Sequence, residues 1–362
     1  MSARLRADLA LVGFGHVGRR FATLLEERRD VLSGQCDLRC RIVGIATRRT
    51  GAWFDHRGID LNDRRNDAGV SAGPAAAFEV IEQLGQSDAD LRIVVETTTL
   101  DVSSGQPAID HVRAAFAAGC HVITANKGPV AFAYAPLSAE AAAAALSFLF
   151  EGSVMDGVPV FNLVREALPL VTVTGFRGVV NSTTNHILTA MEQGHAFDAS
   201  LARMQAEGIA EADASLDLDG WDAAAKTAAL ANVLLDARTS PLAVDRIGIC
   251  AADGPRAREA RANGRRLKLV ASAVRESSGR VSARVEPVEL AGSDLLAGLD
   301  GKANALLLQT DLLGEIAICQ LEGNLTHTAY ALLSDLVTIA RRQARPAAPA
   351  RRIPGSAGRS QS

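Results

Sequence analysis

The sequence has few cysteines, no long apolar run and no metal-binding spacing. Its five cysteines are scattered without a CxxC pair, and its seven histidines show no HExxH-type pattern, so it indicates neither a disulfide framework nor a zinc site. No stretch reaches about 18 uncharged apolar residues, and the apolar run near the start is too short for a signal peptide. We therefore expect a cytoplasmic protein with no membrane partner.

The sequence also lacks a strong net charge. With 38 basic and 41 acidic residues the formal net charge is −3, which provides no basic field to hold nucleic acid. Six basic residues gather in Arg256–Lys268, but no aromatic residue lies among them. We interpret that segment as a solvated helix face rather than a nucleic-acid patch, and we expect no nucleic-acid partner.

A glycine-rich turn follows the first apolar segment of the chain. Leu9–Val12 is typical of a buried strand and Arg19–Glu27 of an amphipathic helix, and the six residues between them, GFGHVG, form a GxGxxG motif. In that motif the first glycine makes a tight turn, the second admits a pyrophosphate, and the third allows the helix to pack closely on the strand. The motif predicts a dinucleotide site, and a glycine-rich turn that binds nothing is the alternative.

No acidic residue follows the second predicted strand, Arg41–Ala46. NAD-specific folds place an Asp or Glu there to hold the ribose 2′-hydroxyl, whereas this sequence continues with Thr47, Arg48 and Arg49. Arginine side chains suit a 2′-phosphate, so the sequence favours NADP, with Arg48 as the predicted contact. NAD stays an alternative, because Arg28–Arg39, which we interpret as an inserted loop, lengthens the interval between the glycine turn and this strand.

Strands and helices alternate up to about residue 150, which predicts a Rossmann-type doubly wound parallel sheet over residues 1–150. Helices are expected around 75–84, 108–118 and 137–145, strands at 92–96, 121–124 and 147–150, and a surface excursion at 53–74. Ligands of such sheets bind beyond the carboxyl ends of the strands, where Thr97 and Thr98 follow one strand and Lys127 follows the next. We expect these side chains to edge the cofactor cleft, and a solvated loop lysine is the alternative for Lys127.

The rest of the chain predicts an α+β domain over residues 151–342 and a disordered tail over 343–362. After a loop-like segment at 151–159, helices are expected through 168 and at 181–191, 197–207, 222–236 and 326–342, with strands at 171–180, 281–285 and 315–321. The tail shows no apolar periodicity. Two domains agree with the length of 362 residues, because single cores stop growing at about 250–300 residues.

Five carboxylates lie within twelve positions of the segment Gly208–Lys226. They are Glu211, Asp213, Asp217, Asp219 and Asp222. The alanine-rich run that follows predicts a helix with Asp222 in its first turn, and Lys226 stands at i,i+4 on the same face. The pair would present a carboxylate and an ammonium together. The alternative is an exposed loop with an ordinary surface ion pair.

Five motifs occur together in an order that resembles the homoserine dehydrogenases. They are GFGHVG, TANKGP, EGSVMDGVPVF, GVVNSTTNHILTAM and GIAEADASLDLDGWDAAAK, and the resemblance covers about residues 8–340. It implies an aspartate-pathway oxidoreductase, serving threonine, methionine and isoleucine biosynthesis, that interconverts L-homoserine and L-aspartate 4-semialdehyde with NAD(P). It also implies a Rossmann-type domain joined to a catalytic and dimerisation domain, a last helix that packs back on the first domain, and a homodimer.

The resemblance assigns roles to individual residues. Lys226 matches the proton donor, with Asp222 and Lys127 as further catalytic residues. The implied substrate-binding residues are Glu211, Asp217, Asp222 and Thr183. The implied cofactor contacts are Gly13, Phe14, Gly15, His16, Val17, Gly18, Thr97, Thr98, Lys127 and Gly323. A structural sodium ion would be bound by the backbone oxygens of Glu151, Val154, Asp156 and Val158.

The sequence departs from the family pattern in several places. Ala214 stands where a proline is usual, His186 where Tyr or Phe is common, and Met155-Asp156 where small residues are common. The stretch that begins at Gly323 lacks the usual Gly-Ala-Gly start. Because about twenty residues follow the last expected helix, we also expect no regulatory amino-acid-binding domain and little inhibition by L-threonine.

The chemistry agrees with the resemblance. Hydride delivery to an aldehyde leaves an alkoxide, so a positioned acid must supply a proton, and the reverse reaction needs the same group as a base. Lys226 can do this, and the carboxylate loop can hold the α-amino group of a substrate. Two other functions stay open, namely a related NAD(P) oxidoreductase acting on another small amino or hydroxy acid, and a non-catalytic NADP-binding regulator.

Overall fold

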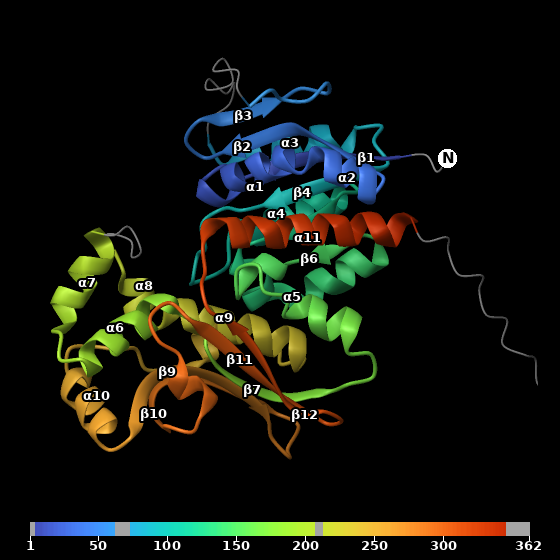
Figure 1. The fold of residues 1–362 in the computed structure, drawn as a ribbon. Coiled ribbons are helices and arrows are strands. Elements are labelled where there is room, and N and C mark those ends of the chain that lie inside the picture. The colour runs from blue at the N-terminus through green and yellow to red at the C-terminus, as the bar shows by residue number, and fades with distance from the viewer. Residues whose placement is uncertain (1–3, 62–72, 207–212, 345–362) are drawn as a thin grey trace, which may run out of the picture.

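The computed structural model describes residues 4–61, 73–206 and 213–344. The chain forms two lobes, each built on a six-stranded sheet (Figure 1). Glu211 and the tail from residue 345 onward lie outside the described residues. Within the described parts, no helix is long and apolar enough to cross a membrane.

The sheet of the first lobe has the strand order β3-β2-β1-β4-β5-β6. Its strands are β1 (Leu5–Val12), β2 (Leu38–Thr47), β3 (Gly51–Phe54), β4 (Leu91–Glu96), β5 (His121–Thr124) and β6 (Phe148–Leu149). All adjacent pairs are parallel except β2 with β3. The helices that connect them are α1 (His16–Glu27), α2 (Arg29–Gln35), α3 (Ala75–Gly85), α4 (Ala108–Ala117) and α5 (Lys127–Ala143). The predicted Rossmann-type sheet is confirmed.

Three expectations for this lobe are wrong. The segment 28–39 contains α2 and the start of β2 instead of a loop. The first two residues of the expected surface excursion, Trp53 and Phe54, belong to β3 (Gly51–Phe54), an antiparallel edge strand. Helix α5 begins at Lys127, ten residues earlier than predicted. Its amino end is stabilised by Asn126, whose side chain accepts a hydrogen bond from the Gly128 backbone, and non-helical backbone at Ala133 absorbs the interruption before Pro136.

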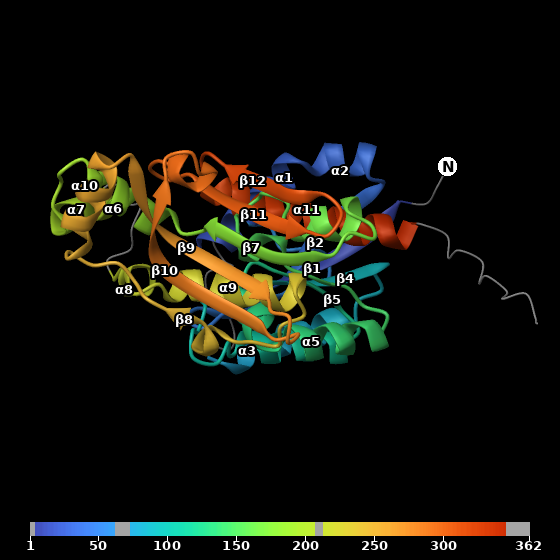
Figure 2. The ribbon, with the colours of Figure 1, turned by 90° about the horizontal axis from the view of Figure 1, so that it is seen from below.

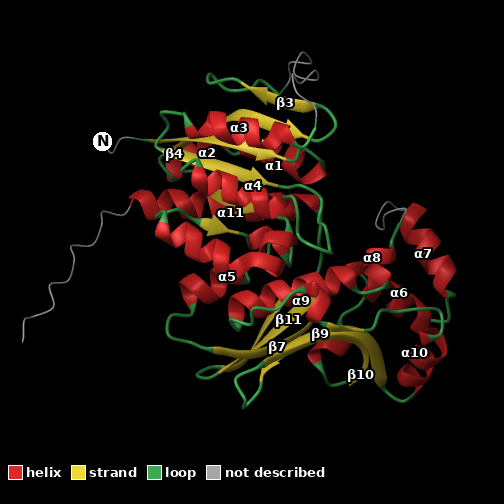
Figure 3. Cartoon of the chain, turned by 180° about the vertical axis from the view of Figure 1, so that it is seen from behind, coloured by secondary structure: helices red, strands yellow, loops and turns green. Residues whose placement is uncertain are grey.

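The second lobe is a mixed sheet with the order β12-β11-β7-β9-β10-β8. Its strands are β7 (Val173–Val179), β8 (Asp245–Arg246), β9 (Arg265–Arg275), β10 (Val281–Ala291), β11 (Asn304–Thr310) and β12 (Gly314–Gln320). Its helices are α6 (Ser182–Glu192), α7 (Phe197–Ala206), α8 (Ser215–Leu218), α9 (Trp221–Leu234) and α10 (Asp253–Ala262). Helix α9 lies behind the sheet in Figure 2, and α6, α7, α8 and α10 gather at one end of it in Figure 3.

The expectation for Arg256–Lys268 holds in part: Arg256, Arg258 and Arg261 are exposed on α10, but the helix ends at Ala262 and β9 begins at Arg265. Within β9 the side chain of Lys268 is fully buried. Strand β11 was not expected from the sequence, and short helix α8 replaces part of the expected carboxylate loop. Lys268 lies between two apolar residues, as an exposed lysine of a strand also does, so the periodicity of the sequence does not show that it is buried.

Two long helices join the lobes. Helix α5 of the first lobe and α9 of the second share one buried apolar cluster, in which Val130 and Ala131 pack with Ala224 and Ala228. The last helix, α11 (Leu325–Ala344), returns across the first lobe (Figure 1). Its apolar face joins the core cluster of α1, as the burial of Leu332 shows. The carboxyl edge of the first sheet is therefore held against α9.

Candidate active site

The glycine turn after β1 has the geometry that a dinucleotide requires. Gly13 has a φ of +91°, and a Cβ at Gly18 would lie 2.7 Å from the carbonyl oxygen of Gly13, so both positions require glycine. A Cβ at Gly15 would meet no atom within 4 Å. Helix α1 has neither a side-chain cap nor an acidic residue in its first turn. Free backbone N–H groups therefore face open space at a helix amino end, which fits a pyrophosphate.

The two threonines after β4 support this turn. Thr97 donates its hydroxyl to the carbonyl oxygen of Gly13 at 2.8 Å, and its backbone packs against that glycine. Thr98 donates its hydroxyl to the buried carboxylate of Glu96 and accepts a bond at its carbonyl oxygen from Asn126 at 3.1 Å. Glu96 and Asn126 were not singled out from the sequence. Their position at the ends of neighbouring parallel strands is the signal that could have found them.

Lys127 reaches from the first lobe into the second. It is the first residue of α5, and its Nζ lies 3.3 Å from Oδ1 of Asp222 in α9. Its side chain is 19% exposed, which argues against the solvated loop lysine. The structure thus brings together two predicted residues that are almost one hundred positions apart in the sequence.

Asp222 and Lys226 form the predicted i,i+4 pair. Oδ2 of Asp222 lies 2.9 Å from Nζ of Lys226, which also donates to the carbonyl oxygen of Val180 at 2.7 Å. The two side chains are 18% and 15% exposed, respectively. An exposed surface ion pair is inconsistent with this burial, and Asp222 lies between two ammonium groups.

Asn181 organises the carboxylates and was missed as a site residue. Its Nδ2 donates to Oδ1 of Asp217 at 2.8 Å and to Oδ2 of Asp222 at 2.9 Å. Its Oδ1 accepts the backbone N–H of Thr184 and so caps α6. Buried Thr183 hydrogen-bonds the same Asp217 carboxylate. The run of polar residues after β7 could have indicated Asn181, because a residue that caps a helix at the end of a strand can direct its side chain toward the site.

The charges of this cluster are fixed by their neighbours. Burial alone would raise the pKa of Asp222, but Lys226 and then Lys127 hold it well below its ordinary value. Burial alone would lower the pKa of Lys226, but Asp222 raises it above the ordinary lysine value, with Asp156 and Asp217 acting in the same sense. The pKa of Asp217 is raised by burial and by Asp222. At neutral pH an ionised carboxylate therefore holds a protonated Lys226.

The carboxylates of the expected metal segment are engaged by the protein. Glu151 accepts backbone N–H groups from Val160 and Phe161 at 2.6 and 2.8 Å. Asp156 accepts Thr328 and Gln320 at 3.0 and 3.2 Å. Among the described residues, no group of three or more His, Cys, Asp or Glu side chains could hold a metal ion. Any ion here would rest on backbone oxygens. In the described hydrogen bonds of this segment, the backbone oxygens at 154, 156 and 158 accept none.

Two further predicted cofactor contacts, Arg48 and Gly323, lie on segments that adjoin the glycine turn or the helix after it. The Gly13 N–H donates to the carbonyl oxygen of Ala46 at 2.8 Å, and exposed Arg48 follows in the tight turn between β2 and β3. A Cβ at Gly323 would lie 2.6 Å from Oδ2 of Asp156. Three residues later Thr326 accepts Arg20 of α1 at 3.0 Å. The start of α11 therefore lies against α1, the helix that follows the glycine turn.

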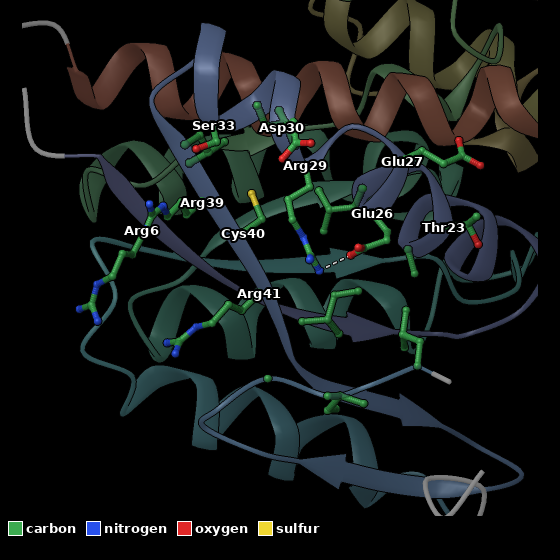
Figure 4. A pocket seen from close by; sticks show the side chains of 18 of the residues that line it. Arg6, Thr23, Glu26, Glu27, Arg29, Asp30, Ser33, Arg39, Cys40 and Arg41 are labelled. Carbon is green, nitrogen blue, oxygen red and sulfur yellow. Dashed lines mark hydrogen bonds and ion pairs between the residues drawn. The ribbon is translucent and has the colours of Figure 1, made fainter. Parts of the chain in front are cut away.

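A separate pocket lies away from these residues (Figure 4). It is lined by α1, α2 and the first half of β2, with Arg29, Arg39, Cys40 and Arg41 at its edge. The first half of β2 is the end of the sheet opposite to the glycine turn. None of the predicted site residues lines it.

Comparison with known proteins decides the family. The homoserine dehydrogenase family model matches residues 159–337, and the model of the homoserine dehydrogenase NAD binding domain matches residues 13–151. The chain belongs to the homoserine dehydrogenase family. It is 36% identical to an NAD(+)-dependent homoserine dehydrogenase of Pseudomonas canavaninivorans, over 91% of this chain and 95% of the relative. It is 32% identical to a homoserine dehydrogenase of Methanocaldococcus jannaschii, over 92% and 98%.

A solved structure agrees with this assignment. The crystal structure of a homoserine dehydrogenase from Thiobacillus denitrificans superposes with a TM-score of 0.78 at 30% identity, covering 93% of this chain and 73% of that one. The likeness extends over both lobes. The family resemblance of the five motifs is therefore confirmed.

Proposed function

We propose that this chain is a homoserine dehydrogenase that interconverts L-homoserine and L-aspartate 4-semialdehyde with a nicotinamide cofactor. The observation that carries the proposal is the buried cluster in which Asp222 contacts both Lys226 and Lys127. The cluster lies where the second lobe meets the lobe that carries the glycine turn. A bound nicotinamide would accept the hydride from the C4 carbon of homoserine, or return it to the aldehyde carbon. The relatives named above support the same reaction.

The protein's own residues move the proton. In reduction of the aldehyde, the ammonium of Lys226 donates its proton to the carbonyl oxygen as the C–H bond forms, which gives the alcohol. In oxidation, the neutral amine of Lys226 takes the hydroxyl proton as the C–H bond breaks. Asp222 and the carbonyl oxygen of Val180 hold Nζ in place for both steps. Because the pKa of Lys226 is raised, oxidation of homoserine should become faster as the pH increases.

The carboxylates bind the amino acid. A cationic α-amino group requires a nearby anion, and Asp217 faces the cluster through its bonds to Asn181 and Thr183. Glu211 is proposed for the same role on the strength of the family pattern alone. Lys127 lies at the junction of the lobes, where its ammonium would stabilise negative charge on the substrate oxygen.

NADP is the cofactor that we propose, with NAD as the alternative. Arg48 lies beyond the end of β2, beside the residue that bonds the glycine turn, and its charge would favour a 2′-phosphate. The Pseudomonas relative is named as NAD(+)-dependent, which supports NAD. Comparing kcat/KM for NADP and NAD at saturating homoserine decides between the two. A higher value for NAD would contradict the proposal.

We also propose that the protein is a homodimer in the cytoplasm and that it serves threonine and methionine biosynthesis. We propose further that it binds a structural sodium ion. The sodium ion would be bound by backbone oxygens of Glu151, Val154, Asp156 and Val158. Light scattering during gel filtration measures the mass in solution. Melting temperatures in sodium and in lithium chloride of equal concentration test the ion, and equal values would contradict it.

The central experiment is an assay of the purified protein with L-homoserine and NADP or NAD, followed by the absorbance of the reduced nicotinamide. Turnover of homoserine in preference to other small amino or hydroxy acids is expected. Better turnover of another such acid would favour a related oxidoreductase. Cofactor binding without any turnover would favour a regulator.

A further inference from the structure

Lys268 is a fully buried lysine for which the proposed reaction has no direct use. It lies in the middle of β9 and is 0% exposed. Its Nζ donates to Oδ1 of Asn185 at 2.9 Å and to the carbonyl oxygen of Leu299. A buried ammonium is unfavourable unless its protons are satisfied, and an apolar side chain of similar length would fill the same space. The contacts of Lys268 therefore point to a purpose other than packing.

Asn185 is the centre of a buried network. Its Nδ2 donates to the carbonyl oxygens of Leu299, Gly301 and Ala303 at 3.3, 3.1 and 3.0 Å. An ammonium donates and cannot accept, so Lys268 requires the amide oxygen of Asn185 to face it. The NH2 group is then directed at the turn. A reversed amide would place its oxygen against the carbonyl oxygens of this turn, which we call the 299–303 turn.

The 299–303 turn leads directly to the active site. The next residue, Asn304, donates to the hydroxyl of Ser182 at 2.9 Å. Ser182 is the first residue of α6 and follows Asn181, whose amide contacts Asp217 and Asp222. Asn185 lies one turn further along the same helix. Both ends of this first turn of α6 are therefore tied to a single short segment.

We propose that Lys268 is a positioning residue for the active site: by fixing Asn185 and the 299–303 turn, it holds α6 where Asn181 reaches Asp217 and Asp222. The inference rests on the proposed function, since its effect is read through homoserine turnover. Lys268 itself touches neither substrate nor cofactor in this account. Its loss displaces the carboxylate end of the site and leaves the glycine turn unchanged.

The charges around Lys268 predict a pH dependence. Glu192 of α6, Arg266 of β9 and Asp300 of the 299–303 turn face it, and Arg261 of α10 lies behind Glu192. Burial lowers the pKa of Lys268 to about 8, which Glu192 opposes. A neutral amine accepts as well as donates hydrogen bonds, so above this pH it no longer fixes the amide. The pKa of Lys226 is raised, so Lys226 does not titrate in the same range.

The test compares Lys268→Met with Lys302→Met, which removes an exposed lysine from the same turn. For Lys268→Met we expect kcat/KM for homoserine to fall by roughly 10–100-fold, the size of effect that small misplacement of catalytic groups produces. The dissociation constant for NADP should change less than about twofold, because the glycine turn is not involved. Lys302→Met should match the wild type. In the wild type the rise of kcat/KM with pH that Lys226 causes should flatten above about pH 8, and Lys268→Met should lack this flattening.

Several results would overturn the proposal. One is a Lys268→Met protein with wild-type kcat/KM, and another is the same flattening of the pH profile above pH 8 in variant and wild type. If Lys268→Met does not fold, Asn185→Leu is measured in its place, and wild-type kinetics there refute the proposal equally. A wild type that fails to oxidise homoserine refutes the proposed function, and the inference falls with it. A wild type that oxidises homoserine beside an unchanged Lys268→Met refutes the inference alone.

Discussion

Asp222→Asn tests whether one carboxylate organises the two active-site lysines. The change keeps the shape of the side chain and removes the charge that lies 2.9 Å from Lys226 and 3.3 Å from Lys127. At an effective dielectric constant of about 20, a unit charge pair at 2.9 Å interacts by roughly 6 kcal/mol. The charge of Asp222 raises the pKa of Lys226, so removing it lowers that pKa.

The pH profile measures that loss. In homoserine oxidation Lys226 acts as a neutral amine, so the rising limb of kcat/KM should move to lower pH in Asp222→Asn. The maximal kcat should fall by roughly 100-fold, because Nζ and the Asn181 amide lose their shared anchor. Asp219→Asn, an exposed neighbour on the same segment, is the matched control and should leave both quantities unchanged.

Stability gives an independent reading of the same substitution. The pKa of Asp222 is lowered on folding, so its contribution is present above the ordinary carboxyl pKa and is lost as the pH falls through the lowered value. Asp222→Asn should therefore lower the melting temperature at pH 7 and lower it less in acid. An unshifted limb together with an unchanged melting temperature at pH 7 would refute the central place given to Asp222.

Two further predictions concern the cofactor. Gly15→Ala should keep the wild-type melting temperature and weaken NADP binding by about 10-fold or more in a fluorescence titration, whereas Gly18→Ala should lower the melting temperature, because its Cβ would meet the Gly13 carbonyl oxygen. Equal melting temperatures would contradict this division. Arg48→Asp should shift the ratio of kcat/KM for NADP to that for NAD towards NAD by about 10-fold or more. An unchanged ratio would place another residue at the ribose.

Local features of the fold could be predicted from the sequence. The GxGxxG turn, the buried strand before it and the pairing of Asp222 with Lys226 depend on residues within one or two turns of each other, and all three are present. The amino end of α5 was misplaced because Gly128, Pro129 and Pro136 disfavour helix, and the kink at Ala133 that accommodates Pro136 depends on tertiary packing.

The features of the site that the sequence does not reveal depend on contacts between residues far apart in the chain. Lys127 meets Asp222 only because α5 packs on α9, and no sequence pattern records that contact. The role of Asn181 depends on α6 starting opposite α9. Lys268 was assigned to a solvated face because its partners, Asn185 and Leu299, come from other elements. Polar residues in buried networks are thus the ones that composition and periodicity describe least well.

The most direct measurement of the central claim is kcat of Lys226→Ala for homoserine oxidation, in protein whose NADP dissociation constant and melting curve show that it is folded. If Lys226 transfers the proton, kcat should fall by roughly 100–10,000-fold, with little change in cofactor binding. A kcat close to the wild-type value in that folded protein would contradict the account and would move the proton-transfer role to Lys127.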